Sequence, residues 1–213
     1  MTRLAYWIVG GVVALGPVAA SYAVEQKPMT PTQQQQPGPG AMDASQEAMM
    51  AKMKEAGSPS EGHARLEPLV GKWRNTAMWW MNPGDAPEVS QGTNENTWIL
   101  GGRYVHSSFS SQAMGQPFEG VGIIGYDNIR HEYSSIWLDN MSTGMVTSTA
   151  QYDPAANALK EQGSFSCPMT GEAQRKFRAT WTFIDPAHYK YEMYTLDQDG
   201  KEFKSMEIAY ERL

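Results

Sequence analysis

The segment Glu172-Ala173-Gln174-Arg175-Lys176-Phe177-Arg178-Ala179-Thr180-Trp181-Thr182-Phe183 decides the fold class of this chain. Its odd positions carry mostly Ala, Phe and Trp, whereas its even positions carry only polar or charged side chains. Successive side chains on a β-strand point to opposite faces of a sheet. The segment is therefore predicted to be a strand with one buried face and one solvated face.

Similar runs extend outward from this segment and fill the chain from Gly71 to Leu213. Short connections rich in Asp, Asn, Gly and Pro separate them, such as Asp197-Gln198-Asp199-Gly200, and these residues are typical of turns. We predict an all-β fold, an antiparallel up-and-down barrel of about ten strands preceded by short N-terminal helices. The predicted strands are residues 72–81, 88–99, 103–112, 118–126, 131–139, 143–152, 158–166, 172–184, 188–196 and 201–212.

The first residues have the pattern of an export signal, predicted over residues 1–23. Arg3 precedes an apolar run from Leu4 to Leu15, and small residues allow cleavage after Ala20 or Ala23. The apolar run is short for a membrane span, although Gly16-Pro17-Val18 could extend it into an uncleaved anchor. We expect an exported protein, periplasmic or secreted, with no stable membrane insertion after signal cleavage.

Three further segments precede the strands. Residues 24–42 are rich in Pro, Gln and Gly and are predicted to be a disordered linker. Residues 43–57 are predicted to be an amphipathic helix with a methionine cluster, which could form either a lid over a barrel mouth or a free arm. The barrel domain is assigned to residues 58–213, and a helical turn at residues 60–69 is expected to plug one barrel end through Leu66 and Leu69.

Composition argues against several function classes. The net charge is -6 and there is no basic run, so nucleic acid is not expected as a partner. The histidines, at positions 63, 106, 131 and 188, have no zinc-ligand spacing, and neither a metal nor another cofactor is expected. Cys167 is the single cysteine, so no intrachain disulfide can form; it is interpreted as a loop thiol or a small buried residue.

The start of the strand series resembles that of lipocalins and related calycins. The resemblance rests on Gly71-Lys72-Trp73, preceded by the short helical turn. It implies a calycin-like barrel in which Trp73 closes one end and packs beneath an Arg from the last strand. Arg212 is the matching residue in this chain, so Gly71, Trp73 and Arg212 are assigned structural roles.

Longer motifs identify the chain as a member of the bacterial family called domain of unknown function 1579, over roughly residues 61–213. This resemblance implies no established activity. One departure is Glu61-Gly62 before His63, where the family usually has Pro and Glu. The matching motifs are Glu61-Gly62-His63, Leu100-Gly101-Gly102-Arg103-Tyr104, Met114-Gly115-Gln116-Pro117-Phe118-Glu119-Gly120, Gly125-Tyr126-Asp127-Asn128, Trp137-Leu138-Asp139-Asn140-Met141-Ser142-Thr143-Gly144 and Asp199-Gly200-Lys201-Glu202-Phe203-Lys204.

The candidate ligand-binding residues are large amphipathic rings together with one arginine. Such a set suits a small, mostly apolar ligand with one polar or acidic end, and Arg103 is the predicted polar anchor. Our first hypothesis is therefore non-catalytic binding in the barrel lumen. The candidates are Trp79, Arg103, Tyr104, His106, Tyr126, Trp137 and Tyr191.

Alternative functions are also considered. An enzyme could use the same lumen, with Tyr104, His106 or Asp139 as acid–base groups, although a non-enzymatic role is favoured. The barrel could instead be solid and serve as a structural or interaction module. Haem, which nitrobindin-type barrels hold through a strand histidine, would need His106 or His188, but nothing in the sequence around them marks either one. Glu192 and Glu207 on neighbouring strands are interpreted as a solvated pair.

Overall fold

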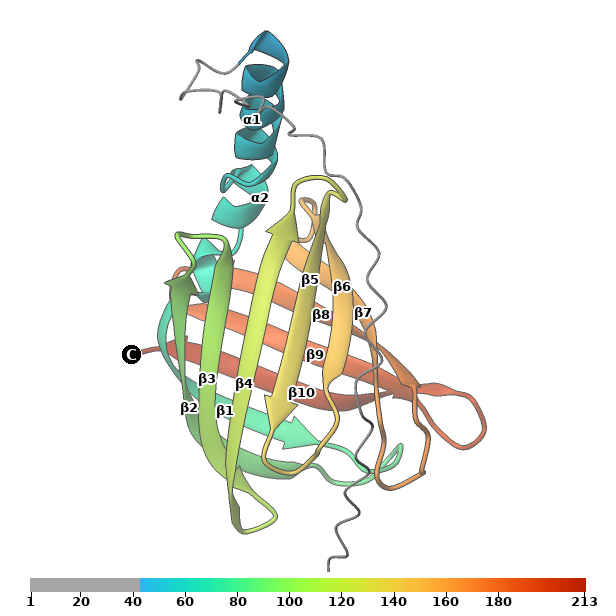
Figure 1. Ribbon diagram of the computed structural model, residues 1–213. Helices are drawn as coiled ribbons and strands as arrows, with labels where there is room; N and C mark the ends of the chain where they lie inside the picture. The colour runs from blue at the N-terminus through green and yellow to red at the C-terminus, as the bar shows by residue number, and fades with distance from the viewer. Residues whose placement is uncertain (1–42) are drawn as a thin grey trace, which may run out of the picture. The chain divides into compact units, whose positions relative to one another are not determined.

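The computed structural model describes residues 43–213, so the predicted export signal and linker lie outside the described residues. Ten strands form one closed antiparallel barrel, in which consecutive strands pair and β1 pairs with β10 (Figure 1). The predicted up-and-down barrel is therefore confirmed. The strands are β1 (Gly71–Trp79), β2 (Glu88–Ile99), β3 (Tyr104–Ala113), β4 (Gln116–Asp127), β5 (Glu132–Asp139), β6 (Val146–Asp153), β7 (Ala158–Phe165), β8 (Arg175–Asp185), β9 (His188–Leu196) and β10 (Glu202–Arg212).

The alternating pattern of burial separates the lumen from the outer surface. On β1, Trp73, Asn75 and Ala77 are buried, whereas Lys72 before Trp73 and Arg74 after it are exposed. Because side chains alternate along every strand and pair across the ladders, this register assigns each position of the barrel to one face.

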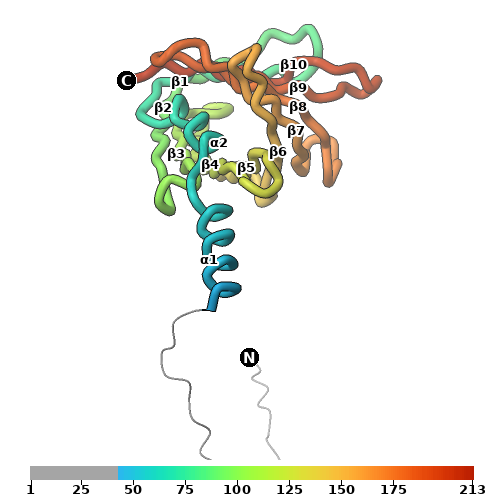
Figure 2. Tube along the Cα trace, turned by 90° about the horizontal axis from the view of Figure 1, so that it is seen from above, coloured from blue at the N-terminus to red at the C-terminus, as the bar shows by residue number. Residues whose placement is uncertain are grey.

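Helix α1 (Ala44–Ala56) begins at a capping box. The Asp43 carboxylate accepts hydrogen bonds from the backbone N–H groups of Ser45 and Gln46, each at 2.9 Å, and the helix ends at Gly57. None of its side chains is buried, and Figure 2 shows it pointing away from the ring of strands. Of the two alternatives, the structure shows an arm rather than a lid.

Helix α2 (Glu61–Ala64) and the 3₁₀ turn η1 (Glu67–Leu69) lead from α1 into the barrel. Leu66 and Leu69 are buried in the same core as Trp73, Tyr133 and Tyr189. These contacts show that residues 60–69 plug one end of the barrel, as expected from their apolar side chains.

Hydrogen bonds attach the plug to the barrel wall. The indole of Trp73 donates to the Leu69 carbonyl at 2.8 Å, and the Tyr133 hydroxyl donates to the Gly62 carbonyl at 2.9 Å. The Arg212 guanidinium lies 4.1 Å from the centroid of the Trp73 ring and donates to the Val70 carbonyl at 2.8 Å. The last strand therefore contacts both the plug and the first strand.

Within residues 43–213, no helix has the length and apolar character needed to cross a bilayer.

We predict that Trp73→Phe lowers the free energy of unfolding by about 1–3 kcal/mol, because it removes a buried hydrogen bond and part of the packing under Arg212. Trp80→Phe is the matched control, since Trp80 lies just beyond β1 and is only partly buried; it should change stability by less than about 1 kcal/mol. Urea unfolding followed by circular dichroism measures both, and equal midpoints would show that Trp73 does not secure the plug.

Candidate functional site

The strand register decides which predicted ligand residues face the lumen. Trp79 pairs with Met206 of β10 and shares the face of the buried Trp73, Asn75 and Ala77. By the same alternation Tyr126, Trp137 and Tyr191 also point inward, and all three pack against the buried core.

Arg103, Tyr104 and His106 do not face the lumen, which corrects the expectation that they line it. Arg103 lies in the turn before β3, where its guanidinium donates to the carbonyls of Gly57 at 2.8 Å and Leu100 at 3.0 Å. Tyr104 and His106 flank the buried, inward-facing Val105 and therefore point outward. Arg103 consequently cannot serve as a polar anchor inside the barrel.

Arg103 and Tyr104 instead line a pocket of about 330 Å³ on the outside of the barrel. Its other walls include the end of α1, His63, the predicted ligand residue Tyr126 and the turn around Asn128. The Asn128 side-chain amide donates to the carbonyls of Ala56 and Ser58. This pocket lies outside the lumen, because Tyr104 pairs with Gly125 on the outward face of β3 and β4.

The plugged end of the lumen is filled by stacked rings. Tyr189 stacks on Tyr210 with centroids 4.1 Å apart, and the edge of Trp73 meets Tyr189 at 4.6 Å. Tyr126 belongs to this end as well, since its ring contacts both His63 and Tyr133.

Farther from the plug, the inward-facing rings remain partly accessible. Trp79, Trp137, Trp181 and Tyr191 are half-buried although their side chains point into the barrel. These inward-facing rings therefore keep some solvent-accessible surface. The barrel is closed by the plug at one end and has an aromatic wall that water-sized molecules can reach.

Glycine on β4 makes room for one of these rings. A Cβ atom at Gly120 would overlap the ring of Trp137. Trp137 also stacks on Phe118 and meets the edge of Phe109, and its indole donates to Asp139 at 3.0 Å. The wall formed by β3, β4 and β5 is therefore packed around the Trp137 indole.

A buried carboxyl group, Glu161 on β7, faces the same lumen. Its side chain is only 8% exposed and lies on the face of the strand that also carries the buried Leu159. The Trp181 indole donates to one carboxyl oxygen at 2.9 Å. Ser148 and Ser135 donate to the other, the latter at 3.3 Å.

Burial raises the pKa of Glu161, although the hydrogen bonds from Ser148, Trp181 and Ser135 oppose part of that rise. Removing an ionised carboxylate from water is unfavourable unless a cation or several donors compensate. Glu161 therefore combines a partly compensated charge with an aromatic wall, a combination typical of binding and catalytic sites.

Glu161 is not among the site residues predicted from the sequence, although the sequence contains a usable signal. One face of this strand carries the odd-numbered residues Leu159, Glu161 and Phe165, and the other face carries Lys160, Gln162 and Ser164. An acidic residue on the mostly apolar face predicts a carboxyl group that points toward the core. We had instead selected residues by ring size and by the presence of arginine.

A second polar group of the lumen wall comes from β1, β2 and β3. Asn94 donates to Asn96 at 2.8 Å and accepts from Ser107 at 3.0 Å. The nearby Asn75 amide is buried, and neither of its polar atoms has a hydrogen-bond partner among residues 43–213. The lumen wall is therefore not uniformly apolar.

The residues proposed for catalysis or haem binding do not converge in the lumen. Asp139 accepts from Trp137 and Met141, while Tyr104 and His106 lie on the outer face. His188 is outward-facing beside the buried Tyr189 and contacts Asp185 at 2.9 Å. A haem held by His106 or His188 inside the barrel does not fit this geometry. Across residues 43–213, no cluster of three or more potential metal ligands occurs.

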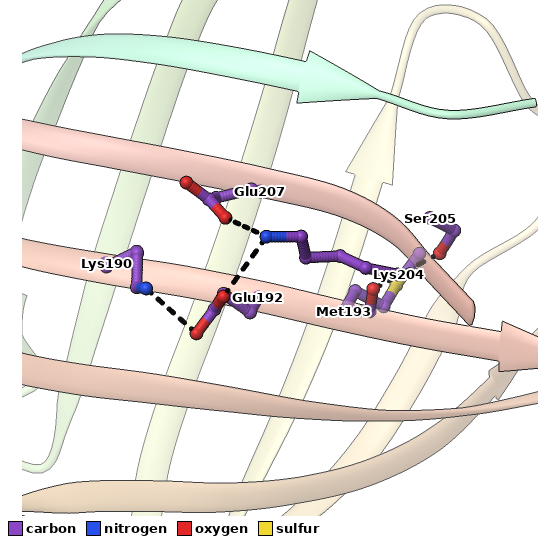
Figure 3. A network of polar contacts seen from close by, with 6 residues as sticks. All are labelled: Lys190, Glu192, Met193, Lys204, Ser205 and Glu207. Carbon is purple, nitrogen blue, oxygen red and sulfur yellow. Dashed lines mark hydrogen bonds and ion pairs between the residues drawn. The ribbon is translucent and has the colours of Figure 1, made fainter. Parts of the chain in front are cut away.

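Glu192 and Glu207 are directly opposite each other on β9 and β10, as expected. Figure 3 shows the Lys204 ammonium between them, with Lys190 on the far side of Glu192. Lys204 lies 3.4 Å and Lys190 3.1 Å from Glu192. Burial alone would raise the pKa of Glu192, but the two lysines hold it below its usual value. The pair is therefore bridged by lysine rather than merely solvated.

The pKa of Glu161 is raised and that of Glu192 is lowered, and these opposite shifts predict opposite effects of pH on the free energy of unfolding. Wild-type protein should lose stability relative to Glu161→Gln as the pH rises from about 4.3 through the raised pKa, with a slope of at most about 1.4 kcal/mol per pH unit. The reason is that, as the pH rises, the Glu161 carboxyl group ionises in the unfolded chain before it ionises in the folded protein.

Glu192→Gln is the matched control. The Glu192 pKa is depressed, so its contribution is present above the unfolded pKa and is lost as the pH falls. Urea unfolding between about pH 2.5 and pH 8 covers both windows, the Glu192 difference below about pH 4.3 and the Glu161 difference above it. A flat difference between wild type and Glu161→Gln would contradict the raised pKa of Glu161.

Solved structures with a similar fold include two barrels of distant sequence. Rv2717c from M. tuberculosis superposes with a TM-score of 0.55 at 12% identity, covering 73% of this chain and 99% of its own length. The S-type phycobiliprotein lyase CPES from Guillardia theta superposes with a TM-score of 0.51 at 10% identity, covering 73% of this chain and 98% of its own. At these identities the likeness establishes the fold alone.

No curated protein matches the sequence. The family described as "Protein of unknown function (DUF1579)" matches residues 58–212, the segment that contains the plug and all ten strands. The chain therefore belongs to the DUF1579 family.

Proposed function

We propose that this barrel binds a small, mostly apolar molecule in its lumen. The observation that carries the proposal is the set of inward-facing rings that remain half-buried, Trp79, Trp137, Trp181 and Tyr191. A solid core would have buried these rings fully, because protein interiors pack at the density of organic crystals. Apolar walls with few polar groups are typical of small-molecule sites.

The closed end of the barrel supports the same proposal. Leu66, Leu69 and the stacked rings of Tyr189 and Tyr210 fill that end, so a ligand would enter from the end opposite the plug. Binding without catalysis is favoured, because the acid–base candidates Tyr104 and His106 lie outside the lumen. From the pattern of residues 1–23 we propose that binding takes place after export.

Adjacent tryptophans on opposite faces provide a direct test. Trp79 faces the lumen, whereas Trp80 faces outward and lies 5.2 Å from the Lys204 ammonium. Nile red, a neutral apolar dye, should fluoresce on binding wild-type protein. Trp79→Ala should weaken its affinity about tenfold or more, because a buried aromatic contact is worth about 1.5–3 kcal/mol.

Trp80→Ala should leave the affinity of Nile red within about threefold, since it removes a ring from the outer face. Thermal unfolding of both variants controls for loss of the fold. Equal loss of dye binding in the two variants, or absence of saturable binding to the wild type, would contradict a ligand site in the lumen.

A further inference from the structure

Glu161 is a buried acid without a cationic partner. Its carboxyl group accepts hydrogen bonds only from neutral donors, two serine hydroxyls and the Trp181 indole. No Lys, Arg or His among residues 43–213 forms an ion pair with it. A buried carboxylate is stabilised by a cation or a metal, or else its pKa rises and it becomes neutral. In its ionised form Glu161 therefore has no cationic partner within residues 43–213.

The carboxyl group also retains acceptor capacity. A carboxylate offers about four lone-pair sites. One oxygen of Glu161 accepts from both Ser135 and Ser148, whereas the other accepts from Trp181 alone. One acceptor position on the second oxygen is therefore available to a donor that enters the lumen.

Trp181 lies beside this oxygen, to which its indole donates at 2.9 Å. The ring of Tyr191 packs against Trp181, with the two centroids 4.5 Å apart. The faces of Trp and Tyr attract cations, most strongly where water is excluded. A carboxylate hydrogen-bonded to one ring of such a pair is the combination that recognises an organic ammonium group.

We propose that Glu161 is the polar anchor of the lumen and that the bound ligand is a hydrophobic amine, whose ammonium group pairs with the carboxylate beside Trp181. This inference rests on the proposed binding function and names the ligand class. It replaces an arginine anchor suited to an acidic ligand with a carboxylate suited to a basic one.

Amine binding is then coupled to proton release. Burial raises the pKa of Glu161 in the empty barrel, so the neutral, protonated carboxyl is favoured there more than at an exposed glutamate, and pairing with an ammonium group favours its ionisation. Tyr191, which packs against Trp181, has a pKa raised well above its usual value mainly by burial, so it stays neutral. Affinity should rise with pH until Glu161 is fully ionised.

The test compares three probes that share a naphthalene ring: 2-(1-naphthyl)ethylamine, 2-(1-naphthyl)ethanol and 1-naphthylacetate. Isothermal titration calorimetry on wild-type protein at pH 7.5 should rank the amine about tenfold or more above the alcohol, with the acetate weakest, because a hydrogen bond to a charged group adds that much. Titrations in two buffers of different ionisation enthalpy should show proton release with the amine only.

Glu161→Gln should remove the preference for the amine and leave the affinity for the alcohol within about threefold, whereas Glu192→Gln on the outer face should keep the preference. If Glu161→Gln does not fold, the wild-type protein alone still tests the amine proposal, through the ranking of the three affinities and the proton release on binding of the amine. Equal affinities for amine and alcohol, or tightest binding of the acetate, would overturn the amine proposal but not the binding function. Failure of all three probes to bind would contradict the binding function itself.

Discussion

The pairing of β1 with β10 is the contact on which the rest of the structure depends. It converts a meander into a barrel without free edges and thereby creates an inside. The same ladder places Arg212 opposite Trp73, where it reaches the Val70 carbonyl and holds the plug at one end of the lumen. Because that end is filled, the accessible rings all belong to the other part of the lumen. Closure thus determines both where a ligand can enter and which walls it meets.

The strands could be predicted from the sequence because their signal is local. Alternation along 172–183 and turn residues such as Asp197–Gly200 act over a few positions, and all ten strands were found, with some boundaries displaced by a few residues. The candidate site was harder, because a shift of one position moves a side chain to the other face. The sequence leaves open which candidate side chains point inward. In the structure Trp79, Tyr126, Trp137 and Tyr191 face the interior, whereas Arg103, Tyr104 and His106 do not. Only the register of the closed barrel distinguishes these two groups.

Glutamates of this barrel show how position changes chemistry. Glu192 and Glu207 share Lys204 on the outer face, and the lysines lower the pKa of Glu192. Glu161 has only neutral donors in the lumen, and burial raises its pKa. Identical side chains therefore act as a surface ion pair in one place and as an unpaired acid in the other. In the amine proposal, this unpaired acid is the feature that gives the aromatic lumen a preferred ligand class.

The most direct test of a ligand-binding lumen is the response of the individual tryptophan indoles. In a ¹⁵N–¹H spectrum each indole N–H gives its own signal, and substitution of single tryptophans assigns them. Saturation with a naphthalene probe should shift the signals of Trp79, Trp137 and Trp181 while leaving that of Trp80 in place. A shift confined to Trp80, or no shift at any indole, would contradict a binding site inside the barrel.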